Sequence, residues 1–557
     1  MLPKKNDIVR LTITAMSSDG NGIGKSDGYT VFVPMTDIGD TVDVLLLKVT
    51  KQYAVGKVVK MIAASDNRIE NDCPVYTRCG GCCFRHISYA QELLYKREFV
   101  LNNLRRIGKL SVDVAPVTSS DSDCRYRNKA VYPVARDRDN HVQIGFYSRR
   151  SHRVVPCEDC RLQPAVFSEI VKKLQVFFEQ TNYSIYDETA HRGVLRYLYL
   201  RRGAVSGEIA VCFVINAAKL PLQNELIRLL TENFPDISGI FTVINREPGN
   251  AILTDRISTV YGKPTVSDEL CGVKLNISPL SFYQVNHSTA QNIYRKAAEI
   301  ADLKPTDTLI DLYCGTGTIG LSMAKKVNRL IGVEIIPAAI ENANENARLN
   351  GITNAEFLCA DAKDAVLKFS ENKIHPDVIV LDPPRKGCDP SVIECVHRMN
   401  PDRVVMISCD SATFARDLAA FAEYGYHTDT VYPFDMFPRT NHVETVCLLS
   451  HKSPDSHINV TVEFGEGEGK VPLDKIVERA KQHQPAPKAT YKLLQEYVEM
   501  KYGFKVHTAY IAEVKRELGL PMYDAPNAEE GLKQTRKHPT QEKVNAIKDA
   551  LNYYNLI

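Results

Sequence analysis

Two residues in the C-terminal half of the chain could do covalent and acid–base chemistry together. Cys409 follows the apolar run 404–407, which we expect to be a strand, and it precedes a helix predicted over 413–421. A cysteine at the carboxyl end of such a strand lies in the ligand crevice of a doubly wound sheet, and the nearby helix N-terminus should lower its pKa and favour the thiolate. Glu444 begins another apolar run, where burial would raise its pKa towards that of a general base. The pair would supply a nucleophile and a base.

A glycine-rich turn at 309–320, LIDLYCGTGTIG, predicts a site for a nucleoside-bearing ligand. Its apolar start indicates a short buried strand, and we expect a helix over 321–327 behind the turn. The glycines, which permit a tight turn and close approach of a ligand to the backbone, are Gly315, Gly317 and Gly320. A second apolar run ends at Glu334, about 20 residues later, where a carboxylate can accept hydrogen bonds from both hydroxyls of a ribose.

Residues near this turn favour S-adenosylmethionine over a dinucleotide. Asp311 ends the strand, and Tyr313 and Cys314 lead into the glycines. S-adenosylmethionine has no pyrophosphate, and its cationic sulfonium and amino-acid tail need anionic and carbonyl acceptors. Gln284 is a polar residue in an apolar context and needs a buried partner, which a cofactor carboxylate or amino group would provide. A dinucleotide and a purely structural turn are the alternatives.

A proline-fixed loop follows the strand expected at 377–381. Its sequence, Asp382-Pro-Pro-Arg385, resembles the loop with which amino-methyltransferases hold an exocyclic amine. Those enzymes carry an aromatic residue where Arg385 stands, and this difference argues against methylation of an amine. Prolines fix a loop without donating hydrogen bonds, so Asp382 and nearby carbonyls are free to bind a ligand.

Cysteines in the N-terminal third have a spacing that suits a metal centre. Cys73, Cys79 and Cys82 form a C-x5-C-x2-C pattern that can present three thiolates on one face. The candidates for a fourth ligand are Cys83, Cys157 and Cys160. All-thiolate sites suit an iron–sulfur cluster or zinc, and the uneven spacing favours a 4Fe–4S cluster over the paired C-x2-C knuckles of zinc. Zinc and free buried cysteines are the alternatives.

The first 60 residues alternate short β-rich runs with turns. We expect five strands, at 8–14, 20–24, 29–34, 41–50 and 53–61, which is typical of a small closed barrel of the OB type. The stretch GNGIGKSDGYTVFVP resembles the TRAM domain, an RNA-binding barrel. Its stacking and phosphate-binding face would consist of Tyr29, Phe32, Lys48, Lys51 and Tyr53. A barrel that only packs on its neighbour is the alternative.

Arginine-rich segments interleaved with aromatic residues predict an RNA-binding surface in the central part of the chain. Basic side chains neutralise phosphates while aromatic rings stack on unpaired bases. The basic residues are Arg125, Arg127, Lys129, Arg136, Arg138, Arg149, Arg150, Arg153, Arg192, Arg196, Arg201 and Arg202. The aromatic residues are Tyr126, Tyr132, Phe146 and Tyr147. A merely solvated charged face is the alternative.

Length and composition are those of an ordinary protein with several domains. The 557 residues are 44% hydrophobic and 24% charged, and the formal charge of +2 means that local patches rather than a global field must meet any nucleic acid. The N-terminus lacks the apolar core of a signal peptide, and no run of 18 apolar residues occurs. We therefore expect a cytoplasmic protein, no membrane span, and cysteines that are not disulfide-bonded.

A nucleophilic cysteine, a carboxylate base and a methyl donor together suit carbon 5 of uracil. That carbon is too weak a nucleophile to take a methyl group directly. Addition of a thiolate to carbon 6 makes carbon 5 enolate-like and able to attack a sulfonium methyl group. A base must then remove the carbon-5 proton so that the thiolate can leave.

Four motifs resemble those of the RNA uracil-5-methyltransferases, the 23S rRNA (uracil-5-)-methyltransferase family: DLYCGTGTIGL, LDPPRKG, ISCDSATFARD and FPRTNHVETV. The CGGC loop and the TRAM-like barrel fit the same group, and the resemblance spans residues 1–450. It implies a Rossmann-like methyltransferase that flips a uridine out of folded RNA, with Cys409 as nucleophile and Glu444 as base. The residues implied to contact S-adenosylmethionine are Gln284, Tyr313, Glu334 and Asp382. The implied 4Fe–4S ligands are Cys73, Cys79, Cys82 and Cys160.

The predicted organisation is a multidomain α/β chain. We expect a TRAM/OB-like barrel at 1–62, a central RNA-binding α/β domain with the iron–sulfur loop at 63–265, a catalytic domain at 266–450, a linker at 451–470 and a helical extension at 471–557. The extension should contain helices at 473–482, 491–502, 508–518 and 541–554, in a helix-turn-helix-like arrangement. Its basic residues Lys505, His507, Lys515 and Arg516 would touch RNA or serve packing.

The resulting hypothesis is a monomeric enzyme that forms 5-methyluridine in 23S rRNA. A tRNA substrate is a close alternative. Two other classes remain open: a non-catalytic, cluster-bearing RNA-binding assembly factor, and a dinucleotide-dependent oxidoreductase with an iron–sulfur centre.

Overall fold

A computed structural model describes residues 3–249, 251–372, 374–451, 491–518, 520 and 538–553. The chain forms two compact units, Met1–Ser453 and Pro454–Ile557. Nearly all of the linker predicted at 451–470 and the whole helix predicted at 473–482 lie outside the described residues. In the described part of the chain, no helix is long and apolar enough to cross a membrane.

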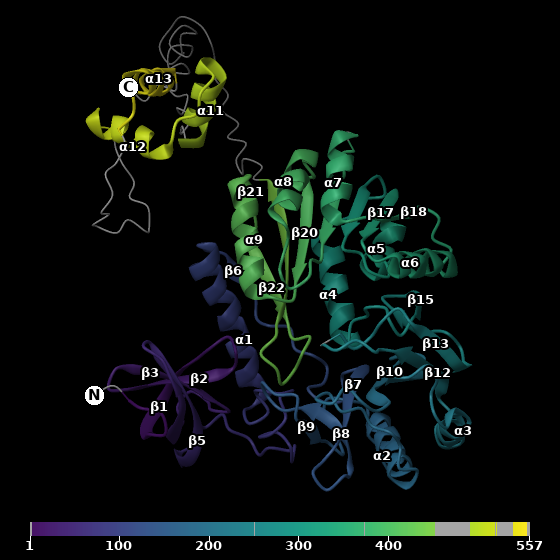
Figure 1. Ribbon diagram of the computed structural model, residues 1–557. Helices are drawn as coiled ribbons and strands as arrows, with labels where there is room; N and C mark the ends of the chain where they lie inside the picture. The colour runs from purple at the N-terminus through teal and green to yellow at the C-terminus, as the bar shows by residue number, and fades with distance from the viewer. Residues whose placement is uncertain are drawn as a thin grey trace, which may run out of the picture. The chain divides into compact units, whose positions relative to one another are not determined.

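The N-terminal strands close into a five-stranded barrel in the order β1-β2-β3-β5-β4, as the sequence predicts (Figure 1). The strands are β1 (Ile8–Met16), β2 (Asn21–Ser26), β3 (Tyr29–Pro34), β4 (Thr41–Val49) and β5 (Tyr53–Ala63). Alternate residues of each strand point inward. The fully buried side chains of Val31, Val33, Val42, Val44 and Leu46 thus make a small core of their own.

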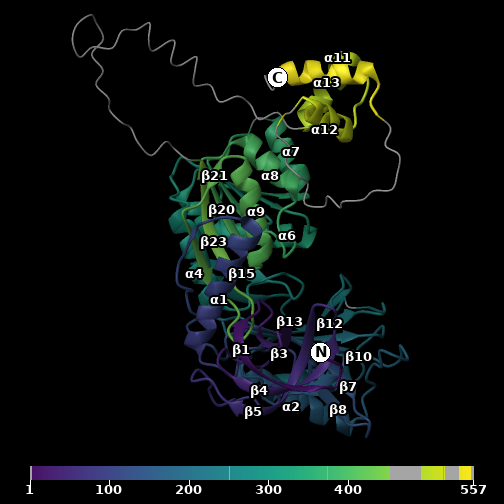
Figure 2. The same ribbon diagram turned by 90° about the vertical axis from the view of Figure 1, so that its left-hand side faces the viewer.

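The first unit contains a seven-stranded sheet in the order β13-β12-β11-β10-β7-β8-β9; Figure 2 labels its strands β7, β8, β10, β12 and β13. Its strands are β7 (Lys129–Arg136), β8 (Val142–Tyr147), β9 (Val154–Pro156), β10 (Leu195–Arg202), β11 (Ile209–Ile215), β12 (Ile237–Ile244) and β13 (Ile257–Gly262). Helices α2 (Ala165–Gln180) and α3 (Gln223–Asn233) bury their apolar residues against it. Every residue of β11 is buried, because both faces of this central strand are covered.

A nine-stranded sheet carries the second half of the first unit, in the order β18-β17-β16-β19-β20-β23-β22-β6, with β21 paired to β23. The strands are β6 (Asp113–Val114), β16 (Thr308–Leu312), β17 (Arg329–Glu334), β18 (Ala355–Cys359), β19 (Val378–Leu381), β20 (Arg403–Ser408), β21 (Tyr426–His427), β22 (Thr430–Phe434) and β23 (Glu444–His451). Strands β16 to β20 pair in parallel, whereas β23 runs antiparallel between β20 and β22.

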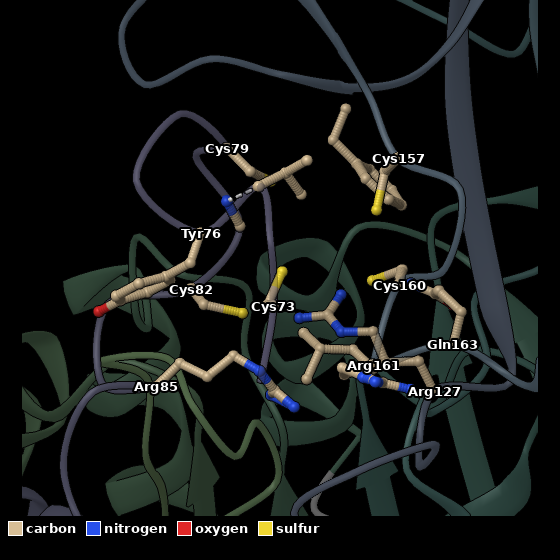
Figure 3. A pocket seen from close by; sticks show the side chains of 14 residues that line it. Cys73, Tyr76, Cys79, Cys82, Arg85, Arg127, Cys157, Cys160, Arg161 and Gln163 are labelled. Carbon is tan, nitrogen blue, oxygen red and sulfur yellow. Dashed lines mark hydrogen bonds between the residues drawn. The ribbon is translucent and has the colours of Figure 1, made fainter. Parts of the chain in front are cut away.

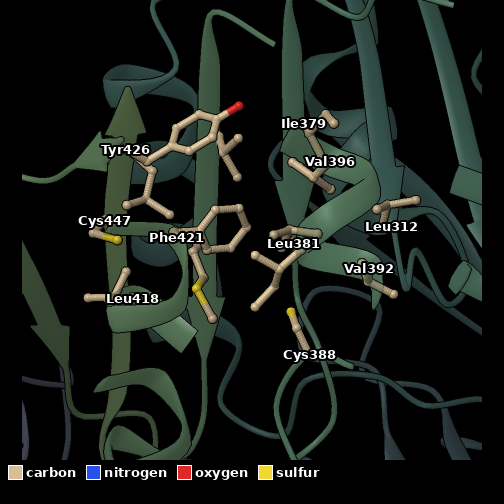
Figure 4. Close-up of a cluster of buried hydrophobic side chains, with 14 of the residues drawn as sticks. Leu312, Ile379, Leu381, Cys388, Val392, Val396, Leu418, Phe421, Tyr426 and Cys447 are labelled. Atoms are coloured by element: carbon tan, nitrogen blue, oxygen red, sulfur yellow. The ribbon is translucent and has the colours of Figure 1, made fainter. Parts of the chain in front are cut away.

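Helices cover both faces of this sheet, as expected for a doubly wound fold. One face packs on α7 (Ala362–Glu371), α8 (Pro390–Met399) and α9 (Ser411–Glu423); Figure 4 shows Val392, Val396, Leu418 and Phe421 meeting strand residues such as Leu381. The other face packs on α4 (His287–Ile300), α5 (Thr318–Met323) and α6 (Pro337–Leu349), beside the hairpin β14 (Val266–Leu270) and β15 (Val273–Ile277). Helix α5 begins three residues before the predicted helix at 321–327 and ends in a 3-10 turn, Ala324–Lys326.

Helix α1 (Tyr89–Asn103) joins the cysteine-bearing segment to the second sheet. Ser88 caps its N-terminus by accepting from Gln91 N. The helix continues into one π-helical turn, Leu104–Gly108, whose buried Leu104 packs with α9 residues in the core.

The second unit contains three described helices, α11 (Tyr491–Tyr502), α12 (Thr508–Glu517) and α13 (Gln541–Tyr553), close to the predicted ranges. They share a core that includes Leu494, Val498, Ile511, Val514 and Ile547. The Asp549 carboxylate on α13 accepts from Lys501 and Tyr502 of α11.

Candidate active site

The carboxyl ends of four parallel strands place the predicted cofactor and nucleophile residues along one edge of the second sheet. Leu312 on β16 pairs with Val333 on β17 and with Leu381 on β19, and Leu381 pairs with Met406 on β20. The residues at or just beyond these ends are Tyr313, Glu334, Asp382 and Cys409. The chain leaves β16 first towards β17 and β18 and then returns to β19 on its other side. Ligands of open α/β sheets bind at such a reversal of strand order.

The antiparallel strand β23 brings Glu444 to the same edge. Ser408, the last residue of β20, pairs with Thr445, so Cys409 and Glu444 are the next two residues in register. The two side chains interact electrostatically, and Glu444 is the charged group that contributes most to raising the pKa of Cys409. A nucleophile and a carboxylate that are 35 residues apart in sequence thus share one crevice.

Burial and neighbouring charge set the protonation of both groups. Glu444 is 5% exposed, and burial, with a smaller contribution from Asp382, raises its pKa to about 8, against the opposing effect of Arg385. This is the expected shift towards a general base. Burial, together with the carboxylates of Glu444 and Asp382, raises the pKa of Cys409 to about 12.

The expectation that a helix N-terminus lowers the pKa of Cys409 is therefore wrong for the protein alone. Asp410 caps α9, and its carboxylate accepts from Ala412 N and Thr413 N. The positive end of the helix is thus already matched by a carboxylate. The nearby negative charges of Glu444 and Asp382 act in the opposite direction on Cys409.

The glycine turn has the shape and charge to hold a cationic nucleoside. Gly315 and Gly317 have φ of +55° and +79°, which favour glycine. Asp311 accepts from Gly320 N at 2.8 Å through Oδ2, while its buried Oδ1 has no hydrogen-bond partner in the described part of the protein. Burial, with smaller contributions from Asp382 and Glu334, raises the pKa of Asp311 to about 7. Three carboxylates that repel one another, with an orphaned buried oxygen, fit the sulfonium and ammonium groups of S-adenosylmethionine.

The other predicted cofactor residues stand in different environments. Glu334 accepts from Gly315 N at 3.2 Å, which ties this carboxylate to the glycine turn. Tyr313 has φ of +65°, an unusual backbone conformation for a non-glycine residue, and packs on the core beneath α8. Gln284 lies outside the sheet, just before α4, and its half-buried side chain has no hydrogen bond within the described residues; its backbone carbonyl accepts from Asn128.

Two exposed isoleucines beside Glu334 were missed by sequence reasoning. Ile335 and Ile336 are 58% and 56% exposed, although both are large apolar side chains. They directly follow the acid at the end of β17 and could cover the flat face of a purine ring. The signal was present in the sequence as two apolar residues after a strand-ending acid.

Five cysteines surround one cavity of about 110 Å³ in the first unit. Figure 3 shows Cys73, Cys79 and Cys82 on one side of this cysteine cavity and Cys157 and Cys160 on the other. In the described chain, no three Cys, His, Asp or Glu side chains converge on a single ion position. A zinc tetrahedron needs sulfurs about 2.3 Å from one point, so thiols spread around a cavity suit a larger cluster better than one zinc ion.

The polar lining of the cysteine cavity also fits an anionic cluster. Arg85, Arg127 and Arg161 line it. Arg127 Nε and Arg85 Nη1 are hydrogen-bond donors that are buried without partners within the described residues. Cys157 hydrogen-bonds the Cys160 sulfur and lowers the pKa of Cys160 to about 7. Cys83, which the sequence also offers as a fourth ligand, does not line the cavity and packs with Phe84 in a separate apolar cluster.

Comparisons with known proteins decide the class of chemistry. The family model described as tRNA (Uracil-5-)-methyltransferase matches residues 88–452, and that of the TRAM domain matches residues 4–59. The chain belongs to the RNA uracil-5-methyltransferase family. It is thus an S-adenosylmethionine-dependent methyltransferase with an N-terminal TRAM barrel. This family assignment excludes the dinucleotide oxidoreductase.

Relatives and solved structures agree with this family. An uncharacterized RNA methyltransferase of Clostridium tetani is 41% identical over 448 residues, which cover 80% of this chain and 97% of the relative. Another, from Halalkalibacterium halodurans, is 40% identical over 450 residues, covering 81% and 98%. The crystal structure of Pyrococcus abyssi tRNA (uracil-54, C5)-methyltransferase in complex with S-adenosyl-L-homocysteine is similar with a TM-score of 0.65 and 28% identity, and covers 79% of this chain and 99% of that one.

Two arginines and one tyrosine predicted to contact RNA are internal in this methyltransferase. Arg196 is 4% exposed and donates to Asn245 O, while Arg201 is 2% exposed and donates to Ser281 O. Tyr132 is 2% exposed. An RNA-binding role is therefore wrong for these three residues. They lie on inner strands of the seven-stranded sheet, where both faces are covered.

The barrel does present an open basic and aromatic surface. Phe32 and Tyr53 meet edge to face with ring centroids 5.5 Å apart, and they line a groove of about 950 Å³ together with Lys48, Arg149 and Arg150. Of the predicted barrel face, Phe32, Lys48 and Tyr53 thus lie in the groove, whereas two residues do not line it, namely Tyr29 and Lys51.

Proposed function

We propose that this methyltransferase forms 5-methyluridine in 23S rRNA, with Cys409 as the nucleophile and Glu444 as the base. The observation that carries the proposal is the β20–β23 register, which pairs Ser408 with Thr445 and makes the nucleophile and the base neighbours. The motif resemblance to the rRNA-modifying family supports the choice of rRNA.

The chain's own residues account for the covalent addition to the uracil ring and for the removal of the carbon-5 proton. The Cys409 thiolate adds to carbon 6 of uracil, and carbon 5 becomes nucleophilic. S-adenosylmethionine, when bound, supplies the electrophilic methyl group and a positive charge. Glu444 then takes the proton from carbon 5, the carbon 5–carbon 6 double bond forms again, and the Cys409 thiolate leaves. Burial and the neighbouring carboxylates raise the pKa of Cys409, so any cation bound in this crevice favours the thiolate.

We also propose that the cofactor is held by Gln284, Tyr313, Glu334 and Asp382. Support comes from the orphaned oxygen of Asp311 and from the half-buried Asp382, whose pKa burial raises to about 7. The carboxylate of Glu334 would bind the ribose, and Asp382 would lie close to the transferred group. Gln284 would close the crevice from the side of α4.

The cysteine cavity, we propose, holds a 4Fe–4S cluster bound by Cys73, Cys79, Cys82 and Cys160. Methyl transfer needs no electron transfer, so the cluster would serve structure by joining the 73–82 loop to the segment that carries Cys160. The buried, unpartnered nitrogens of Arg85 and Arg127 would donate to its sulfides.

A tRNA substrate is the second candidate, since the similar Pyrococcus abyssi protein is a tRNA (uracil-54, C5)-methyltransferase. The test is to map 5-methyluridine in 23S rRNA and tRNA from cells with the intact gene, with a deletion, and with a Cys409→Ala allele. We expect one 23S rRNA position to lose its methyl group in both altered strains. Loss confined to tRNA would select the second candidate, and full methylation with Cys409→Ala would refute the covalent mechanism. A deletion strain that keeps 5-methyluridine at every position would favour the non-catalytic assembly factor.

A further inference from the structure

The loop 435–443, which leads into Glu444, is fixed by charged side chains that are almost completely buried. Asp435 is 0% exposed and Arg439 is 6% exposed. Their partners are on α1 and the residues before it: Glu92 and Lys96 are both 0% exposed. Buried charges are costly to leave unpaired, so this group of four, here called the charge knot, holds the loop in one geometry.

Lys96 connects α1 to the start of the loop. Its Nζ lies 2.8 Å from Glu92 Oε1, 2.7 Å from Asp435 Oδ1 and 3.2 Å from the backbone oxygen of Phe437. Three acceptors occupy the three N–H bonds of the ammonium group. Any shift of the 435–437 backbone would therefore break a hydrogen bond to a buried charge.

Arg439 connects the middle of the loop to the segment that follows the cysteine loop. Its backbone N donates to Glu92 Oε1 at 2.7 Å, and its Nη1 donates to the Ile87 carbonyl at 2.8 Å. Its own carbonyl accepts from Cys83 N at 2.9 Å and from Phe84 N at 3.2 Å. Its guanidinium pairs with Asp123.

The backbone of Arg439 is also in a conformation that needs outside support. Its φ of +69° lies in the left-handed region that non-glycine residues seldom adopt. Such a conformation persists where surrounding contacts over-determine it. Those contacts come from residues 83–92 and Asp123, all distant in sequence from the loop.

We propose that Arg439 and the charge knot are positioning residues for Glu444. This inference rests on the proposed role of Glu444 as the base. Glu444 follows Arg439 by five residues, and the turn between them is closed by Thr440, which donates to the Phe437 carbonyl and accepts from His442 N. Cys409 is held by the end of β20 and the capped start of α9, and no charge-knot residue belongs to either element, although β20 also pairs with β23.

Cys409 and Glu444 act in different halves of the reaction, so displacing Glu444 should affect only the second half. Formation of the Cys409–carbon 6 bond and methylation of carbon 5 need Cys409 in place but not Glu444. In the last step the carbon 5–hydrogen bond breaks, the proton goes to Glu444, the electron pair restores the carbon 5–carbon 6 double bond, and the sulfur–carbon 6 bond breaks. A misplaced Glu444 would leave methylated RNA covalently attached to Cys409.

The experiment measures how a radioactive methyl group divides between protein-linked RNA and released RNA on denaturing gels, in a single turnover. The variants are Arg439→Lys, which keeps the charge but loses the planar fork, and Glu92→Gln, which keeps the side-chain volume and leaves one carboxylate for each of Lys96 and Arg439. The matched control is Arg403→Lys. Arg403 donates to the carbonyl of Ala301 and pairs with Asp307 at 2.9 Å, and it lies at the end of β20 remote from Cys409.

We expect Arg439→Lys and Glu92→Gln to raise the ratio of protein-linked to released label at least about tenfold, while Arg403→Lys leaves the ratio unchanged. Equal losses of linked and released label, with an unchanged ratio, would show that Arg439 serves only general stability and would overturn the inference. Glu444→Gln is measured in parallel. Release at the wild-type rate by that variant would overturn the proposed function itself, whereas accumulation in Glu444→Gln without accumulation in the other two would overturn only the inference. Thermal melts identify a variant that does not fold, and the other variant then decides.

Discussion

Replacing the buried carboxylate of Glu444 by an amide should stabilise the protein above neutral pH. A carboxyl group whose pKa is raised on folding binds its proton more tightly in the folded state than in the unfolded state. Below its ordinary pKa of 4.5 the group is protonated in both states and has no effect. As the pH rises, the unfolded chain loses the proton first, and the wild-type protein loses stability until the folded-state pKa, about 8, is passed.

The size of this effect follows from the interval between the two pKa values. Each pH unit between 4.5 and about 8 lowers the free energy of unfolding of the wild type by about 1.4 kcal/mol. The free energy of unfolding of Glu444→Gln should therefore exceed that of the wild type by about 1 kcal/mol near pH 5.5 and by about 5 kcal/mol above pH 8. The amide keeps the size of the side chain and cannot ionise.

The measurement is thermal and urea unfolding of the full chain without cofactor, from pH 5.5 to 9, for the wild type and Glu444→Gln. The matched control is Glu423→Gln, which changes an exposed glutamate on α9. We expect the control to follow the wild type at every pH. A constant difference across the pH range, or a Glu444→Gln protein that is less stable at pH 8.5 than the wild type, would refute burial of an ionisable carboxyl at this position.

Three further predictions concern turnover, the cysteine cavity and RNA binding. The rate of product release in a single turnover should rise with pH and level off near pH 8, because Glu444 accepts a proton only in its ionised form; a pH-independent rate would exclude it as the base. Cys79→Ser should abolish the visible absorption of an iron–sulfur cluster and reduce bound iron and sulfide, whereas the exposed Cys359→Ser should not; stoichiometric zinc without iron in the wild type would contradict the cluster. Lys48→Ala should weaken RNA binding and lower the slope of log binding constant against log salt concentration by about one, whereas Lys51→Ala, outside the groove, should change neither. Equal effects of the two variants would place the RNA elsewhere.

Strand ends were predictable because the apolar runs of a parallel sheet are continuous and end in polar residues. The positions of Tyr313, Glu334, Asp382 and Cys409 at one edge follow directly from that pattern. The five-stranded barrel was predictable for a similar reason, since each strand alternates and each turn carries glycine or a small polar residue. These are local signals, and they survive into the fold.

Properties that depend on distant neighbours were not predictable from the sequence. The pKa of Cys409 was expected to fall, but it rises because the thiol is buried by the folded chain and because Glu444, from another strand, and Asp382 contribute negative charge. Lys96 and Glu92 have the spacing of an ordinary exposed pair on a helix, and nothing local indicates Asp435, which is 339 residues away. The arginines of β10 resembled an exposed basic face in the sequence. A strand that is covered on both faces lacks the alternation of apolar and polar residues that would reveal its burial.

The position of β23 between β20 and β22 has a consequence for how the protein is made. This strand is the last of its sheet to leave the ribosome, yet it belongs in the interior of the sheet. Until it is inserted, β20 and β22 each present an unpaired edge on the nascent chain, and the crevice lacks its carboxylate. Release of a chain that stops before residue 444 would thus yield a protein able to collapse but unable to complete either its sheet or its chemistry.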